Sequence, residues 1–364
     1  MKIAVFHNFL DNIGGAEIVG LTLARELNAD VYTTNIDQEK IIKMGFGDVL
    51  PRIYSIGKVP INAPFKQQLA LLRFRFLNLN NKYNFYIIDG DWAMAGAVNN
   101  KPNLWYVHSP IREIWDLYKY TRQNTVPWFL RWFFDVWVLY NRHLNKKYVN
   151  YVDKLVCNSE NTKNRIKKYL NKDAVVINPP IETSKFYFEN PPAGGGDYWL
   201  SVNRLITHKR IDLQLKSFAK LPEEKLIIVG SYEQSRHFIK YAKYCGEIKP
   251  KNVEIKNWVS QDKLIDLYAN CKGFITTSQD EDFGMNVVEA MASGKPVIAP
   301  NEGGYKETII NNKTGILIDN IDENKLIEAI KFIDQNPEKY KDACLKQSQN
   351  FDTKIFINKL SKLF

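Results

Sequence analysis

The sequence has few cysteines and no long apolar run, and each absence narrows the class of protein. The four cysteines, Cys157, Cys245, Cys271 and Cys344, lie far apart and show no paired spacing. This pattern argues against a zinc site or a disulfide framework and suits a reducing compartment. No stretch offers about 18 uninterrupted apolar residues, which a membrane-spanning helix would need. The apolar run at the N-terminus is too short for a signal peptide, so we expect a cytoplasmic protein.

Low-complexity tracts and internal repeats are also absent. The composition, with 45% hydrophobic and 25% charged residues, is typical of a soluble globular protein. A length of 364 residues allows two domains that each bury a core. The net charge of +10 gathers in the first half, where residues 51–180 hold 20 Lys and Arg against 8 Asp and Glu. This excess indicates an anionic partner, although a solvated lysine-rich surface explains it equally well.

Strand-like and helix-like segments alternate along the chain, which predicts an α/β protein with parallel sheets covered on both faces. A Pro- and Gly-rich stretch interrupts the alternation and predicts a linker over 181–197. We therefore expect two facing, doubly wound Rossmann-like domains, 1–180 and 198–349, with a cleft between them and a C-terminal helix near 350–364 packing back on the first. The strands are expected at 2–8, 30–34, 84–89, 103–108, 154–158, 174–178, 198–203, 225–230, 253–259, 273–278, 296–300 and 315–318.

Three strand-to-helix turns carry chemical groups, and ligands in such sheets bind beyond the carboxyl ends of the strands. After the first strand, Gly14 and Gly15 let a ligand approach the backbone at a helix N-terminus. No GxGxxG or Gly-Lys-Ser/Thr sequence supports a nicotinamide or P-loop site. In "NRLITHKRID", Arg204 and Lys209 could neutralise a diphosphate. Structural glycines and surface cations are the alternatives.

The third turn, "TTSQDEDFGMNVVEAMASGKPVIAP" (276–300), sets Glu281 ahead of an expected helix and Glu289 inside it. Five residues from Gly284 to Glu289 advance about 7 Å along a helix. An anion bound at the helix N-terminus would thus have a carboxylate on either side. This layout suits a diphosphate that carries a hexose on one end and a ribose on the other, because each carboxylate can accept hydrogen bonds from the hydroxyls of one sugar. An acidic loop followed by a helix-surface Glu is the alternative.

Taken together, these segments resemble the retaining glycosyltransferases of the GT-B fold, specifically the large fourth family (group 1). The resemblance covers nearly the whole chain and includes "GGAE", "YVHSPIREIWDLY", "VCNSENTKNRI", "NRLITHKRID", "EDFGMNVVEAMASGKPVIAPNEGGYKETI" and "TGILI". The middle segment "HSPIREIWDLY" looks most like mannosyltransferases that build surface polysaccharides and N-glycan precursors. One departure is Asn203, where the family usually has Gly.

The resemblance implies a role for each matching residue. Arg204 and Lys209 would hold the donor diphosphate and stabilise the leaving nucleotide. Glu281 and the backbone amides of Phe283, Gly284 and Met285 would bind the donor sugar, and Glu289 the ribose. Gly15 would approach the phosphate or the acceptor. The acceptor side would comprise Gly14, Gly15, His108 and Arg112, with His108 also assisting catalysis near the sugar.

The expected activity is transfer of a hexose, with mannose preferred, to a lipid-linked or polysaccharide acceptor by a metal-independent front-face mechanism. The donor would be a nucleotide sugar, with GDP-mannose preferred over a UDP-sugar, and no cofactor would be required. "DGD" at Asp89–Asp91 imitates a metal motif, but it lies in the first domain, away from the phosphates. A catalytically silent nucleotide-sugar-binding or scaffold subunit is the alternative function, and a phosphorylase or epimerase remains open. Nucleic-acid binding lacks a reading motif.

Two basic, aromatic-rich segments bear on contact with an anionic membrane surface. Residues 64–83 mix apolar residues with Lys66, Arg73 and Arg75 and are the preferred membrane-contact segment. Residues 128–148 hold seven aromatics in their first thirteen positions, and we expect most of this helix to be buried over the first sheet. Peripheral contact with the cytoplasmic face of a membrane is therefore part of the expectation.

Overall fold

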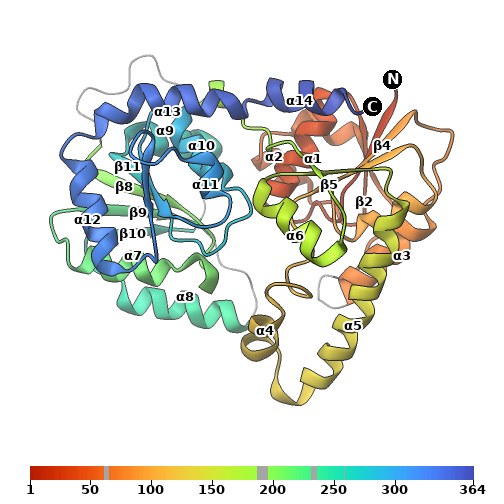
Figure 1. Cartoon of the computed structure of the whole chain (residues 1–364), viewed down its shortest axis with the longest axis horizontal. Helices are drawn as coiled ribbons and strands as arrows, with labels where there is room; N and C mark the ends of the chain where they lie inside the picture. Colours follow the sequence, from red (N-terminus) through yellow and green to blue (C-terminus); the bar gives the residue numbers. More distant parts are fainter. Residues whose placement is uncertain (61–64, 187–195, 231–235, 258) are drawn as a thin grey trace. The chain divides into compact units, whose positions relative to one another are not determined.

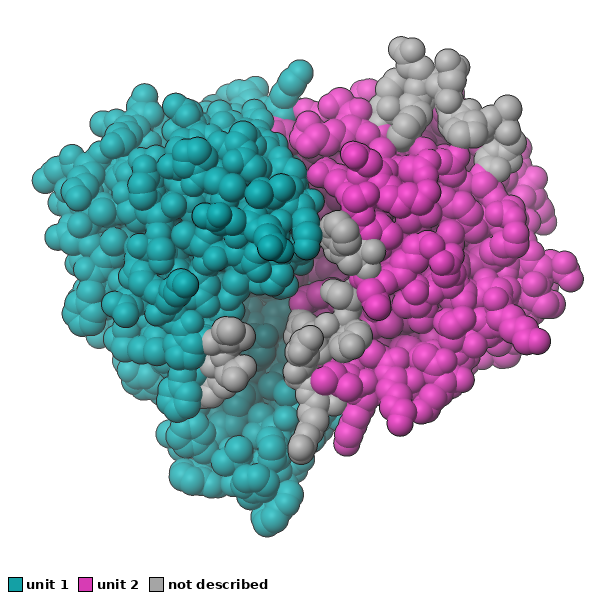
Figure 2. Space-filling model, turned by 180° about the vertical axis from the view of Figure 1, so that it is seen from behind, with its two compact units in different colours: residues 1–180, 354–364 teal, residues 181–353 magenta. Residues whose placement is uncertain are grey.

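Two parallel β-sheets organise the chain in the computed structural model, which describes residues 1–60, 65–186, 196–230, 236–257 and 259–364. Two compact units follow the sheets: unit 1 holds residues 1–180 and 354–364, and unit 2 holds residues 181–353 (Figure 2). Of the predicted linker over 181–197, residues 181–186 and 196–197 belong to unit 2, and 187–195 lie outside the described residues.

Within the described residues, unit 1 has a seven-stranded parallel sheet in the order β3-β2-β1-β4-β5-β6-β7. Its central strands are buried on both faces, as parallel strands covered by helices must be. The strands are β1 Ile3–Phe6, β2 Asp30–Thr33, β3 Ile53–Ser55, β4 Phe85–Ile88, β5 Asn103–Val107, β6 Lys154–Cys157 and β7 Val175–Val176.

Helices cover both faces of this sheet (Figure 1). The last helix returns to unit 1, where Phe356 is buried and packs edge-on against Tyr106 with the ring centroids 5.5 Å apart. Ser159 caps α6 by accepting a hydrogen bond from the Thr162 amide. The helices are α1 Gly15–Glu26, α2 Gln38–Lys43, α3 Phe65–Phe76, α4 Tyr118–Tyr120, α5 Arg131–Tyr148, α6 Glu160–Leu170 and α14 Thr353–Ser361.

Unit 2 has a six-stranded parallel sheet in the described residues, in the order β10-β9-β8-β11-β12-β13. The strands are β8 Tyr198–Val202, β9 Lys225–Val229, β10 Val253–Lys256, β11 Gly273–Ile275, β12 Val297–Pro300 and β13 Gly315–Ile318. The helices are α7 Ile211–Ala219, α8 Arg236–Ile248, α9 Gln261–Asn270, α10 Met285–Ala292, α11 Tyr305–Thr308, α12 Glu323–Asp334 and α13 Lys341–Ser348.

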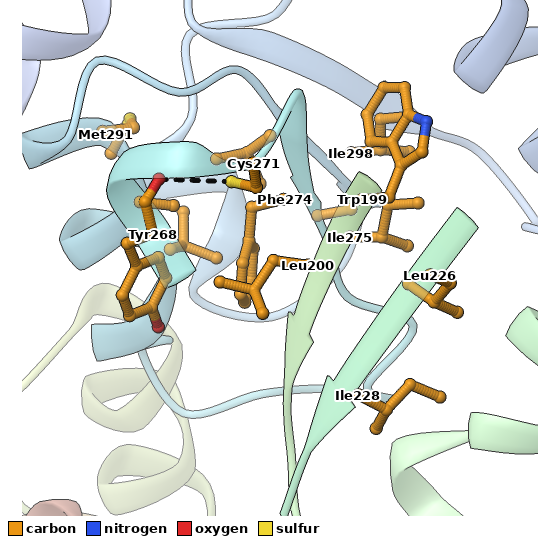
Figure 3. Close-up of a cluster of buried hydrophobic side chains, with 14 of the residues drawn as sticks. Trp199, Leu200, Leu226, Ile228, Tyr268, Cys271, Phe274, Ile275, Met291 and Ile298 are labelled. Atoms are coloured by element: carbon orange, nitrogen blue, oxygen red, sulfur yellow. Dashed lines mark hydrogen bonds between the residues drawn. The ribbon is translucent and has the colours of Figure 1, made fainter. Parts of the chain in front are cut away.

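The core of unit 2 lies on both faces of this sheet and includes buried residues of α7, α9, α10 and α12; Figure 3 shows part of it. Trp199 and Leu200 of β8 and Phe274 of β11 are fully buried in it. Tyr268 and Cys271 close the same cluster, and the Cys271 thiol donates to the Tyr268 carbonyl at 3.3 Å. Because this packing holds β8, β11 and α10 together, it also fixes the turns that follow the two strands.

The predicted fold class is confirmed, with two parallel-sheet α/β units, and two local predictions differ from the structure. The short strand β3 was not predicted, because Tyr54 and Ser55 are exposed and give no buried pattern. The expected burial of the helix over 128–148 is wrong. Only Val138, Asn141, Leu144, Asn145 and Tyr148 of α5 are buried, because they form the one face that packs on unit 1.

In the described residues, no helix is long and apolar enough to span a membrane.

Candidate functional site

The turns after β8 and β11 meet at one edge of the sheet in unit 2, because these two parallel strands are neighbours. Lys209 Nζ lies 2.5 Å from Glu281 Oε2, and both side chains are partly buried. The Thr277 hydroxyl donates to the Lys209 carbonyl at 2.8 Å, and the Gln279 amide donates to the His208 carbonyl at 2.8 Å. The structure therefore brings Lys209 and Glu281 together, although they are 72 residues apart in sequence.

Arg210 stabilises the same turn, and the sequence analysis did not predict it as a site residue. Its φ of 49° is left-handed, and its Nε donates to the Thr277 carbonyl at 2.6 Å. Its guanidinium also pairs with Glu302, in the turn after β12. Arg204 is exposed at the start of the turn. The doublet Lys209–Arg210 was the available signal, but only the fold shows that Arg210 connects the turns after β8, β11 and β12.

Asn203, the predicted departure from the family pattern, is buried beneath this turn. Its amide nitrogen donates to the Ser201 hydroxyl, and its carbonyl oxygen accepts from the Ser278 hydroxyl, both at 3.2 Å. The side chain thus joins the turn after β8 to the turn after β11.

The turn before α10 presents backbone more than side chains. Gly284 caps the helix with φ +90°, and a Cβ there would lie 2.6 Å from the Tyr305 ring. Glycine is required here on both counts. The Phe283 side chain is buried against Phe351, and the Glu281 carbonyl accepts from the Gly304 amide at 2.8 Å. Because these contacts hold the turn, the amides at the start of α10, including that of Met285, have the orientation that suits an anion.

Glu289 lies in α10 as predicted, and its carboxylate is held by a residue that sequence reasoning missed. The Tyr268 hydroxyl donates to Glu289 Oε2 at 2.8 Å. Burial raises the pKa of the Glu289 carboxyl above its usual range, and the hydrogen bond from Tyr268 only partly offsets this. Tyr268 sits at the end of α9 without a motif, so its role could not be read from spacing.

Unit 1 holds a second cluster, at the carboxyl ends of three neighbouring strands. His7 follows β1, Asp89 follows β4 and His108 follows β5. Asp89 is fully buried, with Oδ2 at 2.9 Å from His7 Nδ1 and Oδ1 at 2.8 Å from His108 Nε2. His108 remains partly exposed, so one side of its ring can meet a ligand. The motif-like "DGD" therefore supplies a carboxylate that joins two histidines.

The opposite charges of Asp89 and the two histidines shift one another's pKa values. Burial by itself lowers the pKa of His108, but the charge and hydrogen bond of Asp89 outweigh burial and raise that pKa above its ordinary value. Burial disfavours the Asp89 carboxylate in turn, and the two histidines still hold the pKa of Asp89 below its usual range. The cluster therefore favours the ionised carboxylate of Asp89 and the protonated forms of His7 and His108.

The remaining predicted residues of unit 1 lie at the N-terminus of α1 and in the turn after β5. Gly14 is the N-cap of α1 and Gly15 its first residue, so the helix N-terminus lies where it was predicted. Arg112 Nη2 pairs with Asp116 Oδ2 at 2.8 Å, four residues on. The structure thus engages the Arg112 guanidinium in an ion pair within its own turn.

Comparison with known proteins agrees with both halves of the chain. Residues 182–349 match the glycosyl transferases group 1 family, and residues 13–185 match glycosyltransferase family 4. The chain is 26% identical over 412 residues to the alpha-1,3/1,6-mannosyltransferase ALG2 of Candida glabrata, covering 94% of this chain and 87% of that protein. It is 28% identical over 188 residues to an uncharacterized glycosyltransferase of Methanocaldococcus jannaschii, and spans about half (51%) of that relative and of itself.

The fold agrees as well. The structure of Anabaena HepE in complex with UDP-glucose superposes with a TM-score of 0.77 at 16% identity, covering 100% of this chain and 99% of that one. A sucrose-phosphate synthase from Thermosynechococcus elongatus gives a TM-score of 0.73 at 17% identity, covering 100% and 98%. With two matching families over residues 13–349 and this fold, the chain belongs to the group 1 glycosyltransferases of the GT-B fold, and its relatives include mannosyltransferases.

Proposed function

We propose that this glycosyltransferase moves a hexose from a nucleotide diphosphate sugar to a lipid-linked or polysaccharide acceptor, with retention of the anomeric configuration. The observation that carries the proposal is the Lys209–Glu281 pair beside the Gly284 turn at the start of α10. An ammonium has three N–H donors, so Lys209 can hold Glu281 and still donate to phosphate oxygens. The two charges are in place before the donor arrives, which suits electrostatic stabilisation of a leaving group.

In this proposal each donor group meets a matching protein group. Arg204, Lys209 and the N-terminus of α10 bind the diphosphate, and no step calls for a metal ion. Glu281 accepts hydrogen bonds from the sugar hydroxyls, and Glu289, oriented by Tyr268, accepts from the ribose. The departing phosphate helps to deprotonate the acceptor in a front-face displacement.

His108 of unit 1 positions the transferred sugar. Its raised pKa favours the protonated ring, in which the nitrogen that does not contact Asp89 donates to sugar oxygens. We prefer mannose as the sugar and GDP as the nucleotide. The ALG2 relatives, named as mannosyltransferases, support mannose, while the HepE complex shows a UDP-sugar in a protein of the same fold.

The decisive experiment measures binding and turnover of GDP-mannose, UDP-glucose and ADP-glucose with the purified chain. We expect one donor to bind and to be consumed with or without a chelator, and NMR of the product to show the donor's anomeric configuration. Inversion, or loss of turnover on chelation that added metal restores, would contradict the mechanism. Binding without turnover over a panel of acceptors would favour the silent binding subunit.

Lys209→Ala should lower turnover at least 100-fold, because it removes the charge that neutralises the leaving diphosphate. Lys272→Ala is the matched control. Lys272 is also partly buried in an ion pair, with Glu224 at 2.9 Å, but it contacts neither turn. Its loss should lower the unfolding temperature and leave turnover per folded molecule unchanged. Turnover by the Lys209→Ala variant equal to that of the unsubstituted protein would contradict the site assignment.

A further inference from the structure

The outward face of α5 is apolar along its first half and in the turn before it. Trp128, Phe129 and Trp132 expose 78%, 55% and 68% of their surface. The stripe continues at three- and four-residue steps, the spacing of one helix face. We call this stripe the aromatic face of α5; its members are Trp128, Phe129, Trp132, Val136, Leu139 and Tyr140.

The opposite side of α5 packs against the core of unit 1, so the aromatic face is not the side by which this helix joins the core. Val138 and Tyr148 are buried in the core of unit 1. The Trp115 indole donates to Asn145 Oδ1 at 3.1 Å, and Asp135 accepts from the Tyr118 hydroxyl and from Arg122 at 2.8 Å. These contacts hold the helix in a fixed orientation with its aromatic face toward solvent.

Charge accompanies the aromatic face. Residues 118–148 carry six Lys and Arg against a single Asp, and Asp135 is neutralised by Arg122. Beyond Tyr140 the same outward side becomes cationic, with Lys146 and Lys147 exposed. Trp132 and Lys147 are about 22 Å apart along the helix axis at 1.5 Å per residue. The face therefore has an aromatic end and a basic end.

We propose that the aromatic face of α5 docks the protein on an anionic lipid bilayer, with the aromatics at the headgroup–acyl boundary and Lys146 and Lys147 against the headgroups. Trp and Tyr favour this boundary, and basic residues near it gain from an anionic leaflet. A protein partner fits less well, because protein interfaces are depleted in lysine. The proposal deepens the proposed transfer to a lipid-linked acceptor, but docking requires neither donor nor acceptor.

The predicted membrane segment, α3, also shows apolar side chains. Phe65, Leu72 and Phe76 expose 67%, 46% and 76% of their surface. However, Leu72 and Phe76 line a hollow of about 580 Å³ together with Tyr32 and Ile56 of unit 1. The apolar side chains of α3 therefore already face other residues of unit 1. For this reason we assign docking to α5 and use α3 as the comparison in the test.

The test is flotation of the purified chain with vesicles of phosphatidylcholine alone or with 30% phosphatidylglycerol. We expect binding to the anionic vesicles, weakened by salt. The triple variant Trp128→Ser, Phe129→Ser, Trp132→Ser should reduce it at least tenfold, and Lys146→Glu with Lys147→Glu should reduce it severalfold. Because all five side chains are exposed, we expect these variants to fold. Phe332→Ser, at a 48% exposed position on α12, is the matched control and should bind as the parent does.

Three outcomes would overturn the proposal. One is undiminished vesicle binding by the triple serine variant. Another is binding abolished by Leu72→Ser with Phe76→Ser on α3 and kept by the triple variant. The last is no vesicle binding together with a concentration-dependent dimer that the triple variant loses, which would assign the face to a second copy of the chain. Nucleotide-sugar binding, measured without vesicles, separates these results from failure of the proposed function.

Discussion

At the scale of single residues, the contact between Asp89 and His108 influences the charge of the partly exposed histidine in the unit 1 cluster. The Asp89 carboxylate outweighs burial and raises the pKa of His108. The folded state therefore gains stability from this proton fully below pH about 6.5, the unfolded value. It loses that contribution as pH rises through the higher folded pKa.

Asp89→Asn should lower the pKa of His108 and move the alkaline limb of the rate profile to lower pH. The variant should also unfold more easily, by about 3 kcal/mol, because a buried charge pair loses one partner. NMR titration of the ring protons checks the pKa, with the resonance assigned by its absence in His108→Gln. An unchanged or higher pKa in the variant would show that Asp89 does not govern this histidine.

At Glu289, burial of the charged carboxylate lowers stability at neutral pH, while the proposed function uses that charge to bind the donor. Its pKa is raised by burial, so the contribution of this carboxyl to stability is present below pH about 4.3 and lost as pH rises through the folded pKa. Glu289→Gln keeps an acceptor for Tyr268 and removes the buried charge. We expect the unfolding temperature at pH 7 to rise by about 1–3 °C, with little change at pH 4.

The same substitution should weaken donor binding, because a neutral amide is a poorer acceptor for ribose hydroxyls than a carboxylate. Calorimetry with the donor and with its sugar-free diphosphate measures the effect on the nucleotide alone. A less stable variant with unaltered affinity would contradict both parts of the argument.

At the scale of elements, α1 approaches the Asp89 cluster through a glycine. A Cβ on Gly20 would lie 2.5 Å from Asp89 Oδ2 and 3.1 Å from His7 Nδ1. Gly20→Ala should cost about 1–3 kcal/mol of unfolding free energy and lower turnover, because the carboxylate has to move. Denaturant unfolding and steady-state rates measure both effects.

Gly246→Ala in α8 is the matched control, since it is also a glycine within a helix but nothing lies within 4 Å of its added Cβ. That change should stabilise the protein by about 0.5–1 kcal/mol. Equal responses of the two glycines would show that close packing at Asp89 has no role.

The elements also show what the sequence could and could not predict. Alternation of apolar segments predicted the parallel sheets, because buried parallel strands read as short apolar runs. The turns of unit 2 were found because glycines and charges cluster at strand ends. Tyr268 and His7 were missed, since nothing in their local sequence marks the carboxylates that they meet. The same apolar signal failed at 128–148, because periodicity shows that a helix has an apolar face but not which face is covered.

At the scale of the whole molecule, α14 completes unit 1 from the far end of the chain. Phe356 and Leu360 are buried there, and Phe364 lies 4.9 Å from Phe85, centroid to centroid. Phe356→Ala should therefore cost about 3–5 kcal/mol, the price of emptying a buried aromatic site. Because Phe356 and its ring partner Tyr106 both belong to unit 1, we expect the change to leave unit 2 unaffected.

Hydrogen exchange can separate the two units within one chain. In Phe356→Ala, amides of β5 and α6 should exchange faster, while those of β8 and β11 keep their protection and donor binding persists. Phe218→Ala, at a fully buried position in α7, should give the reverse pattern. Faster exchange throughout both sheets in either variant would mean that the units unfold together, and single-domain stabilities could then not be assigned.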